Sequence, residues 1–319
     1  MVINTGSRTD IPAYYSDWFY NRIREGYVLV RNPYYHTQVT RYRLSPDVVD
    51  AIVFCTKNPE PMISRLMRLA AFDMFWFVTV TPYGKEIEPY VPDKEQVLAS
   101  FRKLSSLVGR ERISWRYDPV FVTEAYSVAV HIQEFQKMAE ALKGYTKQCV
   151  VSFIDLYEKT KRNFPGIRSV TGSEQECLID TFSKIAKENE MQIHLCCEDA
   201  SLVRENLDAD GCLSKAVMQK ALGCRLDVPN QKAAREACSC LLGADIGAYN
   251  TCGHGCLYCY ANYDSKVVEE NRKHHDAKSP LLTGNLHQDD VIKQASQKSW
   301  RNGQMNIFDI IEYTMGEYE

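Results

Sequence analysis

The residues best suited to chemistry are cysteines gathered near the end of the chain. In the stretch TCGHGCLYCYAN, Cys252, Cys256 and Cys259 have the spacing C-x3-C-x2-C, and Cys238 and Cys240 lie just upstream in ACSCLLGADIG. Thiolates this close together bind soft metal ions and iron–sulfur clusters, or form disulfides where the compartment is oxidising. The choice between metal and disulfide therefore depends on the compartment.

Composition and the N-terminal residues predict a cytoplasmic protein. The chain has 45% hydrophobic and 25% charged residues, as ordinary globular proteins do. The opening MVINTGSRTD lacks the apolar segment of a secretory signal, and no run approaches the ~18 apolar residues of a membrane span. In a reducing compartment, clustered cysteines bind metal or act in catalysis. The net charge of −3 gives no overall basic field, so any contact with nucleic acid must come from a local patch.

Three kinds of metal centre fit these cysteines. An open cubane cluster takes thiolates from Cys252, Cys256 and Cys259 and leaves its fourth iron free for a small ligand. If Cys238 or Cys240 reaches that iron, the cluster is fully ligated and is structural or an electron carrier. A zinc site would use Cys256 with Cys259 as one pair and Cys238 with Cys240 as an unusually tight second pair.

Other residues of the loop suit a bulky cluster. Gly253 and Gly255 lack side chains where the backbone must wrap closely around such a group. Tyr258, beside the last cysteine, can shield one face of the cluster from water.

The cysteine loop resembles the signature of radical S-adenosylmethionine enzymes, in which an aromatic residue precedes the last of three cysteines at this spacing. Cys252, Cys256, Tyr258 and Cys259 match that signature. The whole chain also resembles an uncharacterised prokaryotic family, a domain of unknown function, that carries such a cluster at its C-terminal end. The resembling stretches are NTGSRTDIPAYYSDW, CTKNPEPM, RYDPV, SFIDLYEK and DIGAYNTCGHGCLYCYAN.

The resemblance implies a 4Fe–4S cluster on the three loop cysteines, with S-adenosylmethionine bound at the open iron. One electron, from a donor such as flavodoxin or ferredoxin, then cleaves the sulfonium, and a 5′-deoxyadenosyl radical abstracts hydrogen from a substrate. The chain departs from the superfamily in two respects. Its loop follows the last candidate strand rather than the first, as a circular permutation would produce, and the Gly-Gly-Glu segment that often holds the methionine amine is absent. We expect Asn4, Asp118 or Glu198 to take that role, with Tyr258 also contacting the cofactor.

A scaffold must position this loop, and the hydrophobic pattern predicts an α/β fold. Apolar runs typical of buried strands alternate with helical stretches, as in a parallel sheet with crossover helices. The expected strands are Val2–Asn4, Ala51–Cys55, Phe75–Val80, Ile113–Tyr117, Val150–Ile154, Ile193–Cys197 and Asp245–Asn250. The expected helices are Asp17–Glu25, Pro59–Ala71, Lys94–Val108, Val128–Leu142, Glu174–Glu190 and Lys215–Leu222. Ser173 and Glu176 resemble a capping box at the start of one of them.

We expect a partial TIM-like barrel of about 6–8 parallel strands, circularly permuted relative to usual radical S-adenosylmethionine barrels, with a doubly wound sheet as the alternative. The barrel would span residues 1–263, including the cluster loop 238–262, and a charged helical or extended tail would follow from 264 to 319. Polar residues follow the strand ends, where barrel enzymes build their sites. They predict a shared polar cavity, unless they merely form turns that end the strands. Catalytic or substrate-binding roles are expected for Arg8, Lys57, Asn58, Arg116 and Asp155.

Two segments bear on substrate and partners. Residues Arg22–Arg43 hold five arginines among tyrosines, which suits phosphate and base contacts. The alternative is a β-hairpin whose tyrosines pack on the barrel. The tail residues Gln304, Met305, Ile307 and Phe308 are similar to the short peptide by which bacterial repair and replication proteins bind the DNA sliding clamp, or they simply anchor the tail on the barrel.

These features favour a radical enzyme acting on nucleic acid, similar to a lesion-repairing lyase of the spore-photoproduct kind. The alternative function is a non-catalytic iron–sulfur or zinc protein that binds nucleic acid or a protein partner. Neither function involves a membrane.

Overall fold

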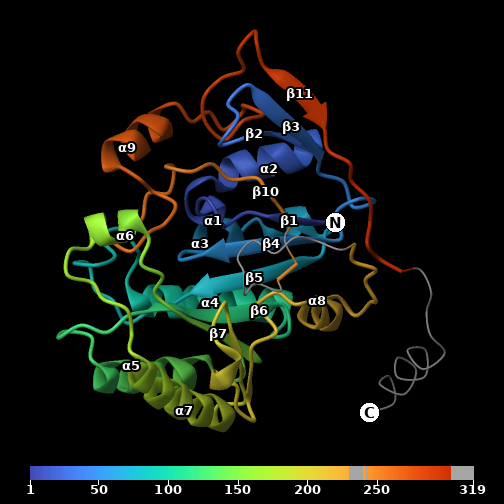
Figure 1. Cartoon of the computed structure of the whole chain (residues 1–319). Coiled ribbons are helices and arrows are strands. Elements are labelled where there is room, and N and C mark those ends of the chain that lie inside the picture. Colours follow the sequence, from blue (N-terminus) through green and yellow to red (C-terminus); the bar gives the residue numbers. More distant parts are fainter. Residues whose placement is uncertain (230–239, 242, 303–319) are drawn as a thin grey trace, which may run out of the picture.

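Eight parallel strands form the central sheet of the protein (Figure 1). The structure is a computed structural model that describes residues 1–229, 240–241 and 243–302. In space the strands follow the order β10-β1-β4-β5-β6-β7-β8-β9. Their bounds are β1 (Val2–Asn4), β4 (Ala51–Thr56), β5 (Met74–Thr79), β6 (Ile113–Val120), β7 (Gln148–Phe153), β8 (Gln192–Leu195), β9 (Leu207–Asp208) and β10 (Ala244–Asp245).

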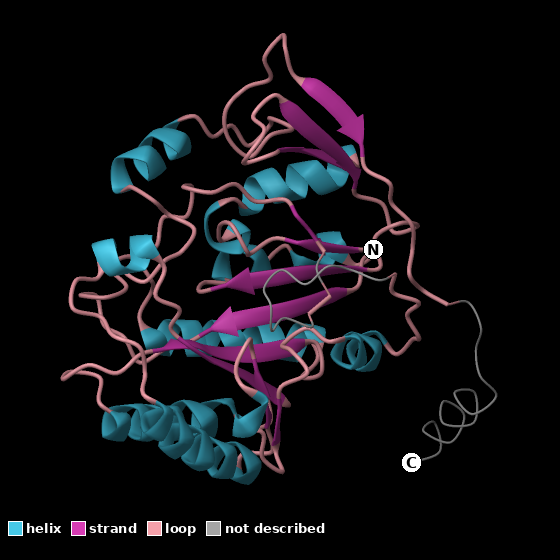
Figure 2. Ribbon diagram, viewed as in Figure 1, coloured by secondary structure: helices cyan, strands magenta, loops and turns pink. Residues whose placement is uncertain are grey.

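Helices follow most of these strands. They are α1 (Ile11–Tyr14), α2 (Ser16–Glu25), α3 (Glu60–Ile63), α4 (Lys94–Val108), α5 (Val128–Leu142), α6 (Glu158–Asn163), α7 (Gly172–Glu188), α8 (Lys215–Leu222) and α9 (Ser265–Lys273). α5 and α7 lie side by side (Figure 2), where Phe135 and Phe182 stack with ring centroids 4.0 Å apart. Among the described residues, no helix has both the length and the apolar character needed to cross a membrane.

Both faces of the sheet are covered, which explains the continuous apolar runs of its strands. Along β4, Ile52 and Phe54 belong to one buried cluster, and Ala51 and Val53 belong to another. The first cluster contains the apolar sides of α2, α4, α5 and α7. The second contains residues of α8 and Trp300. Alternate residues of β4 therefore pack into two separate layers.

The strand order agrees with the predicted parallel α/β sheet. From β1 to β9 the order runs in one direction, whereas a doubly wound sheet reverses its order part-way. The sheet is open: β9 and β10 form its edges, and within the described residues they do not pair with each other.

β10, the last strand of the central sheet along the chain, lies beside β1, the first strand along the chain. β10 pairs in parallel with β1, and Asn4 stands opposite Asp245. The predicted strand Asp245–Asn250 was too long, because the chain leaves the sheet after Asp245, whose carboxylate accepts a hydrogen bond from Ser7 N at 2.8 Å. The cysteine loop therefore begins next to the end of β1.

One predicted helix is broken. Residues Pro59–Ala71 form only α3 and a 3-10 turn at Leu66–Leu69. The break falls at Arg65, whose backbone lies outside the helical region (φ −118°, ψ 12°). Its guanidinium donates to Ser16 Oγ at 3.1 Å, a contact that an uninterrupted helix need not provide.

The capping box of α7 lies two residues earlier than predicted. Thr171 is the N-cap and accepts from Glu174 N, while the Glu174 carboxylate accepts from Thr171 N at 2.9 Å. The predicted pair, Ser173 with Glu176, does not form the box. Arg168 selects the earlier register, because its guanidinium donates to both carboxylate oxygens of Glu174 at 2.7 and 2.8 Å.

A second, three-stranded sheet covers α2 (Figure 1). Its strands are β2 (Tyr27–Arg31), β3 (Gln38–Arg43) and β11 (Val291–Gln294). β2 and β3 are antiparallel, which confirms the predicted hairpin, but Tyr34 and Tyr35 at its turn are exposed instead of packed on the rest of the protein. β11 was not predicted and pairs in parallel with β3. Upstream of it, Trp18 Nε1 of α2 donates to Ser279 O at 2.9 Å, so residues before β11 pack on α2.

Candidate metal centre

The cysteine loop is anchored by hydrogen bonds within itself and to a neighbouring segment. Asn262 Nδ2 donates to Cys252 O at 2.8 Å, which joins the two ends of the loop. Leu257 N donates to Ile87 O at 3.0 Å and ties the middle of the loop to the segment that follows β5. The positions of the three cysteines are thus fixed by protein contacts.

His254 and Gly253 hold the loop against α1 and α9. The His254 ring is buried, with Nε2 2.8 Å from an Asp10 carboxylate oxygen and Nδ1 3.0 Å from Tyr14 OH. A Cβ at Gly253 would collide with the Arg272 guanidinium and the Tyr14 ring. Packing of Arg272 and Tyr14 therefore also disfavours a side chain at Gly253, and its predicted close approach to a cluster stays a prediction.

The three loop thiols do not converge as tightly as the ligands of one metal ion would. Cys252, Cys256 and Cys259 are partly buried, and their sulfur atoms do not all lie within 4.8 Å of one another. A single tetrahedral zinc holds its sulfur ligands about 3.8 Å apart, given Zn–S bonds of about 2.3 Å. A cubane takes one thiolate at each corner and so spreads them further. Burial raises the pKa of all three thiols, so a bound metal is what would keep them deprotonated.

A buried ion pair lies beside Cys256. Glu88 accepts from Lys57 Nζ at 2.9 Å, from Thr81 Oγ1 at 2.8 Å and from the Tyr258 hydroxyl. Burial opposes both charges, but Lys57 lowers the pKa of Glu88, and Glu88 and the Cys256 thiol raise the pKa of Lys57. The pair is therefore charged, and Tyr258 links it to the cysteine loop.

Glu88 also lines a cavity of about 360 Å³ at the carboxyl end of β5. Thr81, Tyr83, Lys85 and Lys94 are among its other lining residues. The volume is within the range of small-molecule sites. Glu88 thus connects this cavity with the residues around Cys256.

A second ion pair, partly buried, lies on β6. Arg116 pairs with Asp118, and Arg116 Nη1 donates to Cys55 Sγ at 3.0 Å. Asp118 also accepts from the Ser152 hydroxyl of β7. Burial opposes the charge on Arg116, yet Asp118 raises its pKa well above the usual value. Asp118 contributes to the raised pKa of Lys57 as well, so the two ion pairs are neighbours at the carboxyl end of the sheet.

Asn4 and Arg8 form the turn after β1. Asn4 Oδ1 accepts from Gly6 N at 2.9 Å, and its Nδ2 donates to Ser7 Oγ at 2.8 Å. Arg8 Nε lies 3.9 Å from a carboxylate oxygen of Asp245, the last residue of β10. Both residues therefore border the point where the cysteine loop begins.

The remaining predicted residues at strand ends have different surroundings. Glu198 Oε1 accepts from Phe153 N at 2.7 Å, and burial raises the pKa of Glu198 to about 8. Asn58 Oδ1 accepts from Glu60 N at 3.3 Å at the start of α3. Asp155 is exposed just beyond β7. The structure thus gathers Lys57, Asp118 and Arg116, and places Asn58 in a helix-start turn.

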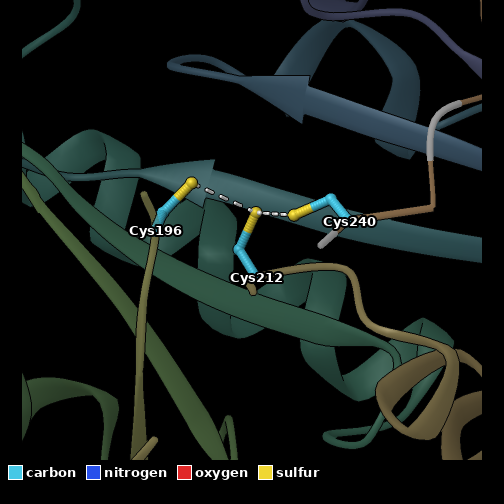
Figure 3. A group of neighbouring side chains, drawn as sticks. All are labelled: Cys196, Cys212 and Cys240. Atoms are coloured by element: carbon cyan, nitrogen blue, oxygen red, sulfur yellow. Dashed lines mark hydrogen bonds between the residues drawn. The ribbon is translucent and has the colours of Figure 1, made fainter. Parts of the chain in front are cut away.

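Cys240 belongs to a second group of thiols. Its sulfur lies 3.3 Å from that of Cys212, which in turn lies 3.7 Å from that of Cys196 (Figure 3). The other upstream cysteine and the predicted clamp-binding residues lie outside the described residues; these are Cys238, Gln304, Met305, Ile307 and Phe308.

The sequence interpretation missed Glu88, Asp10 and the grouping of Cys196 with Cys212. Glu88 follows β5 in TPYGKEIEP, so a carboxylate in a segment after a strand was an available signal. Cys196 and Cys212 are 16 residues apart and carry no short spacing motif. Only the fold brings them together.

The arginines of the hairpin are partly engaged by protein groups. Arg31 forms an ion pair with Asp290, and the Arg41 guanidinium lies over the Tyr27 ring, 4.2 Å from its centre. At the turn of the hairpin, Tyr34 is 80% exposed. Arg31 and Arg41 therefore already contact protein groups, whereas Tyr34 and Tyr35 (64% exposed) remain accessible to a ligand.

Comparison with known proteins identifies the family of the chain but no activity. A search of curated proteins finds no match to the chain. The family model described as Domain of unknown function (DUF1848) matches residues 2–261, from β1 through the cysteine loop. The predicted resemblance to an uncharacterised family is thereby confirmed. With most of its length matched, the chain belongs to the DUF1848 family.

Proposed function

We propose that the protein is a radical S-adenosylmethionine enzyme whose 4Fe–4S cluster is held by Cys252, Cys256 and Cys259. The strand order carries this proposal. The cysteine loop follows β10, which is the last strand of the sheet along the chain. In space, however, β10 is the edge strand beside β1, so the loop follows the first strand of the sheet in spatial order. This order supports a circularly permuted partial barrel, in which the loop holds the place it has in the superfamily it resembles.

When bound, the cluster with S-adenosylmethionine supplies one-electron cleavage of the sulfonium to methionine and a 5′-deoxyadenosyl radical, the electron coming from a donor such as flavodoxin or ferredoxin. The chain's own residues position these groups and exclude water. Tyr258 is fixed beside Cys256 by its hydrogen bond to Glu88. Lys57 places a cation next to the thiolates, which stabilises their negative charge.

Asn4 is the favoured partner for the amine of S-adenosylmethionine. It stands opposite Asp245, from which the cysteine loop departs. Asn4 Oδ1 accepts one hydrogen bond, from Gly6 N, and keeps a second lone pair, whereas Arg116 and the Ser152 hydroxyl engage the two carboxylate oxygens of Asp118. Glu198, whose pKa burial raises to about 8, is mostly protonated at neutral pH and so has no charge advantage over Asn4, and its Oε1 already accepts from Phe153 N.

Nucleic acid is the substrate class that the surface around the loop favours. Tyr157, Tyr260 and Tyr263 are 41%, 47% and 46% exposed. Lys159 Nζ lies 3.6 Å from the centre of the Tyr263 ring. Exposed rings beside a cation suit the stacking of unpaired bases and contact with phosphate. Docking of the tail peptide on the DNA sliding clamp would bring such an enzyme to its substrate.

The test of this function is cleavage of S-adenosylmethionine. The full chain is reconstituted anaerobically with iron and sulfide, reduced with dithionite and mixed with S-adenosylmethionine. We expect 5′-deoxyadenosine in the products and a change in the spin-resonance spectrum of the cluster on addition of S-adenosylmethionine. Cys256→Ala should abolish both, whereas Cys177→Ala, which changes an exposed cysteine of α7, should retain them.

Absence of 5′-deoxyadenosine above the Cys256→Ala background would reject catalysis. Zinc without iron or sulfide would instead select the non-catalytic metalloprotein. For the substrate class, Tyr260→Ala with Tyr263→Ala should weaken binding of a fluorescent single-stranded oligonucleotide at least about tenfold, since each stacked base contributes about 1–3 kcal/mol. Tyr145→Ala, at another partly exposed tyrosine, is the control and should leave binding unchanged.

A further inference from the structure

Three cysteines outside the loop converge from separate parts of the chain. Cys196 follows β8, Cys212 follows β9, and Cys240 precedes β10. Their side chains point toward one another (Figure 3), and all three sulfur atoms lie within 4.8 Å of one another. We propose that Cys196, Cys212 and Cys240 form a second metal site, which binds a single Zn²⁺ ion.

The sulfur–sulfur distances fit one tetrahedral ion. Cys196 and Cys212 are separated by 3.7 Å and Cys212 and Cys240 by 3.3 Å, against about 3.8 Å expected around a zinc with Zn–S bonds of about 2.3 Å. The corners of a cubane would hold thiolates further apart. A disulfide would require about 2.05 Å. The group therefore differs in kind from the loop cysteines, which do not converge in this way.

Thiolate ligands select the metal. Sulfur donors favour zinc, copper(I) and iron–sulfur centres over magnesium, calcium and manganese. Zn²⁺ is usually tetrahedral in structural sites and has no redox chemistry. Three protein ligands leave its fourth position for a water molecule or another small ligand.

The surroundings also suit bound thiolates. Leu213 N donates to Cys240 Sγ at 3.4 Å, and Leu241 N donates to Leu213 O at 2.8 Å. Backbone N–H bonds to sulfur orient metal ligands and stabilise their charge. The Arg116 guanidinium lies close enough to Cys212 and Cys196 for these thiols to raise its pKa. Three thiolates with one Zn²⁺ would carry a net negative charge, which this nearby cation would stabilise.

The site would join the two edges of the sheet. Cys212 lies four residues beyond β9 and Cys240 four residues before β10, and these edge strands do not pair with each other among the described residues. A bound ion would hold the segment leading into β10, and β10 carries the loop with Cys252. This role does not depend on radical chemistry.

The experiment measures metal in a chain that lacks the other centre. A full-length variant with Cys252, Cys256 and Cys259 all changed to alanine is purified anaerobically with zinc supplied. We expect about one zinc per chain. When the metal is replaced by Co²⁺, the cobalt should show the strong thiolate-to-metal absorption of a tetrahedral sulfur site. Adding Cys212→Ser should remove the zinc and the absorption, whereas adding Cys177→Ser should change neither.

A second measurement covers the case in which Cys212→Ser fails to fold. Alkylation followed by mass spectrometry should find Cys196, Cys212 and Cys240 protected in the zinc form and reactive after chelation. Three outcomes would overturn the site: no zinc in the triple variant, zinc that persists with Cys212→Ser, or equal reactivity of the three thiols with and without chelator. A disulfide between Cys212 and Cys240 in the anaerobic protein would overturn it as well.

Discussion

Glu88 is the residue on which the polar contacts beside the cysteine loop converge. Its carboxylate accepts from Lys57, Thr81 and the Tyr258 hydroxyl, and its side chain is 5% exposed. Removing its charge leaves the buried Lys57 ammonium without its counter-ion. A buried pair contributes little net stability when intact, but breaking it by removing one partner is costly. The same carboxylate accepts a hydrogen bond from Tyr258, which lies beside Cys256, so its loss should also change the surroundings of the cysteine loop.

We therefore predict that Glu88→Gln lowers the free energy of unfolding by about 3 kcal/mol, measured by denaturant titration. Lys57→Met in the same chain should recover part of this loss, because the unpaired charge is then gone. Glu269→Gln, which breaks an exposed pair with Lys273, is the matched control and should cause no measurable change. Equal effects of the buried and exposed substitutions would contradict the role assigned to burial.

His131 gives a prediction for pH dependence at the same scale. Its ring is buried, with Nδ1 2.8 Å from Tyr117 OH and Nε2 2.8 Å from Phe121 O. Because a carbonyl only accepts, Nε2 carries the proton and Nδ1 accepts from the tyrosine. Burial lowers the pKa of His131, so the unfolded chain binds a proton that the folded chain resists. Stability should therefore fall as pH drops below about 6.5, the value for an unperturbed histidine.

Urea titrations at pH 7.5 and 5.5 test this sign. His131→Gln should reduce the difference in unfolding free energy between the two pH values, while lowering stability at both. His274→Gln changes an exposed histidine at the end of α9 and should leave the difference as it is. An undiminished pH dependence in His131→Gln would assign it to other groups.

At the scale of elements, the start of α7 shows a case in which the local sequence pattern does not determine the N-cap residue of a helix. The sequence TGSEQE contains two overlapping boxes, Thr171 with Glu174 and Ser173 with Glu176. Each satisfies the capping pattern equally well. The structure uses the first, because Glu174 there also pairs with Arg168. A contact outside the helix settled a choice that the helix pattern leaves open.

Thr171→Ala should accordingly reduce stability by about 1 kcal/mol, the usual cost of losing an N-cap side chain. Ser173→Ala removes the cap of the rejected register and should change stability by less than half as much. Thermal unfolding of both variants gives the comparison. A larger loss from Ser173→Ala would restore the register that the sequence first indicated.

How much of the fold and of the candidate site the sequence predicts depends on how far apart the interacting residues lie along the chain. The helices Lys94–Val108, Val128–Leu142 and Lys215–Leu222 were predicted to the residue, since their amphipathic periods are local. The loop cysteines were found for the same reason. β9 and β11 were missed, because two or four residues that pair with a distant strand have no period of their own. Glu88 was missed likewise, since its partners come from other segments.

At the scale of the whole molecule, the strand order places β1 second in the sheet, between β10 and β4. β10, next to β1, must form from residues far along the sequence, and it pairs through only Ala244 and Asp245. So short an edge strand contributes few hydrogen bonds. The cysteine loop that follows it nevertheless needs a fixed origin. The proposed ion between Cys196, Cys212 and Cys240 would supply that restraint where the sheet is weakest.

Removing this ion should therefore loosen one region rather than the whole protein. After chelation, or in Cys212→Ser, hydrogen exchange should increase in peptides that contain Leu213, Leu241 and the β10–cysteine loop segment. Peptides from α5 and α7 should keep their protection, because those helices pack on the opposite layer. With zinc at a hundred times its dissociation constant, the lost binding corresponds to about 2.7 kcal/mol and a fall in Tm of about 4 °C. Cys177→Ser is the control. An even increase in exchange across all helices would mean that the thiols support the general core, and no increase near β10 would mean that the sheet edges are held together without them.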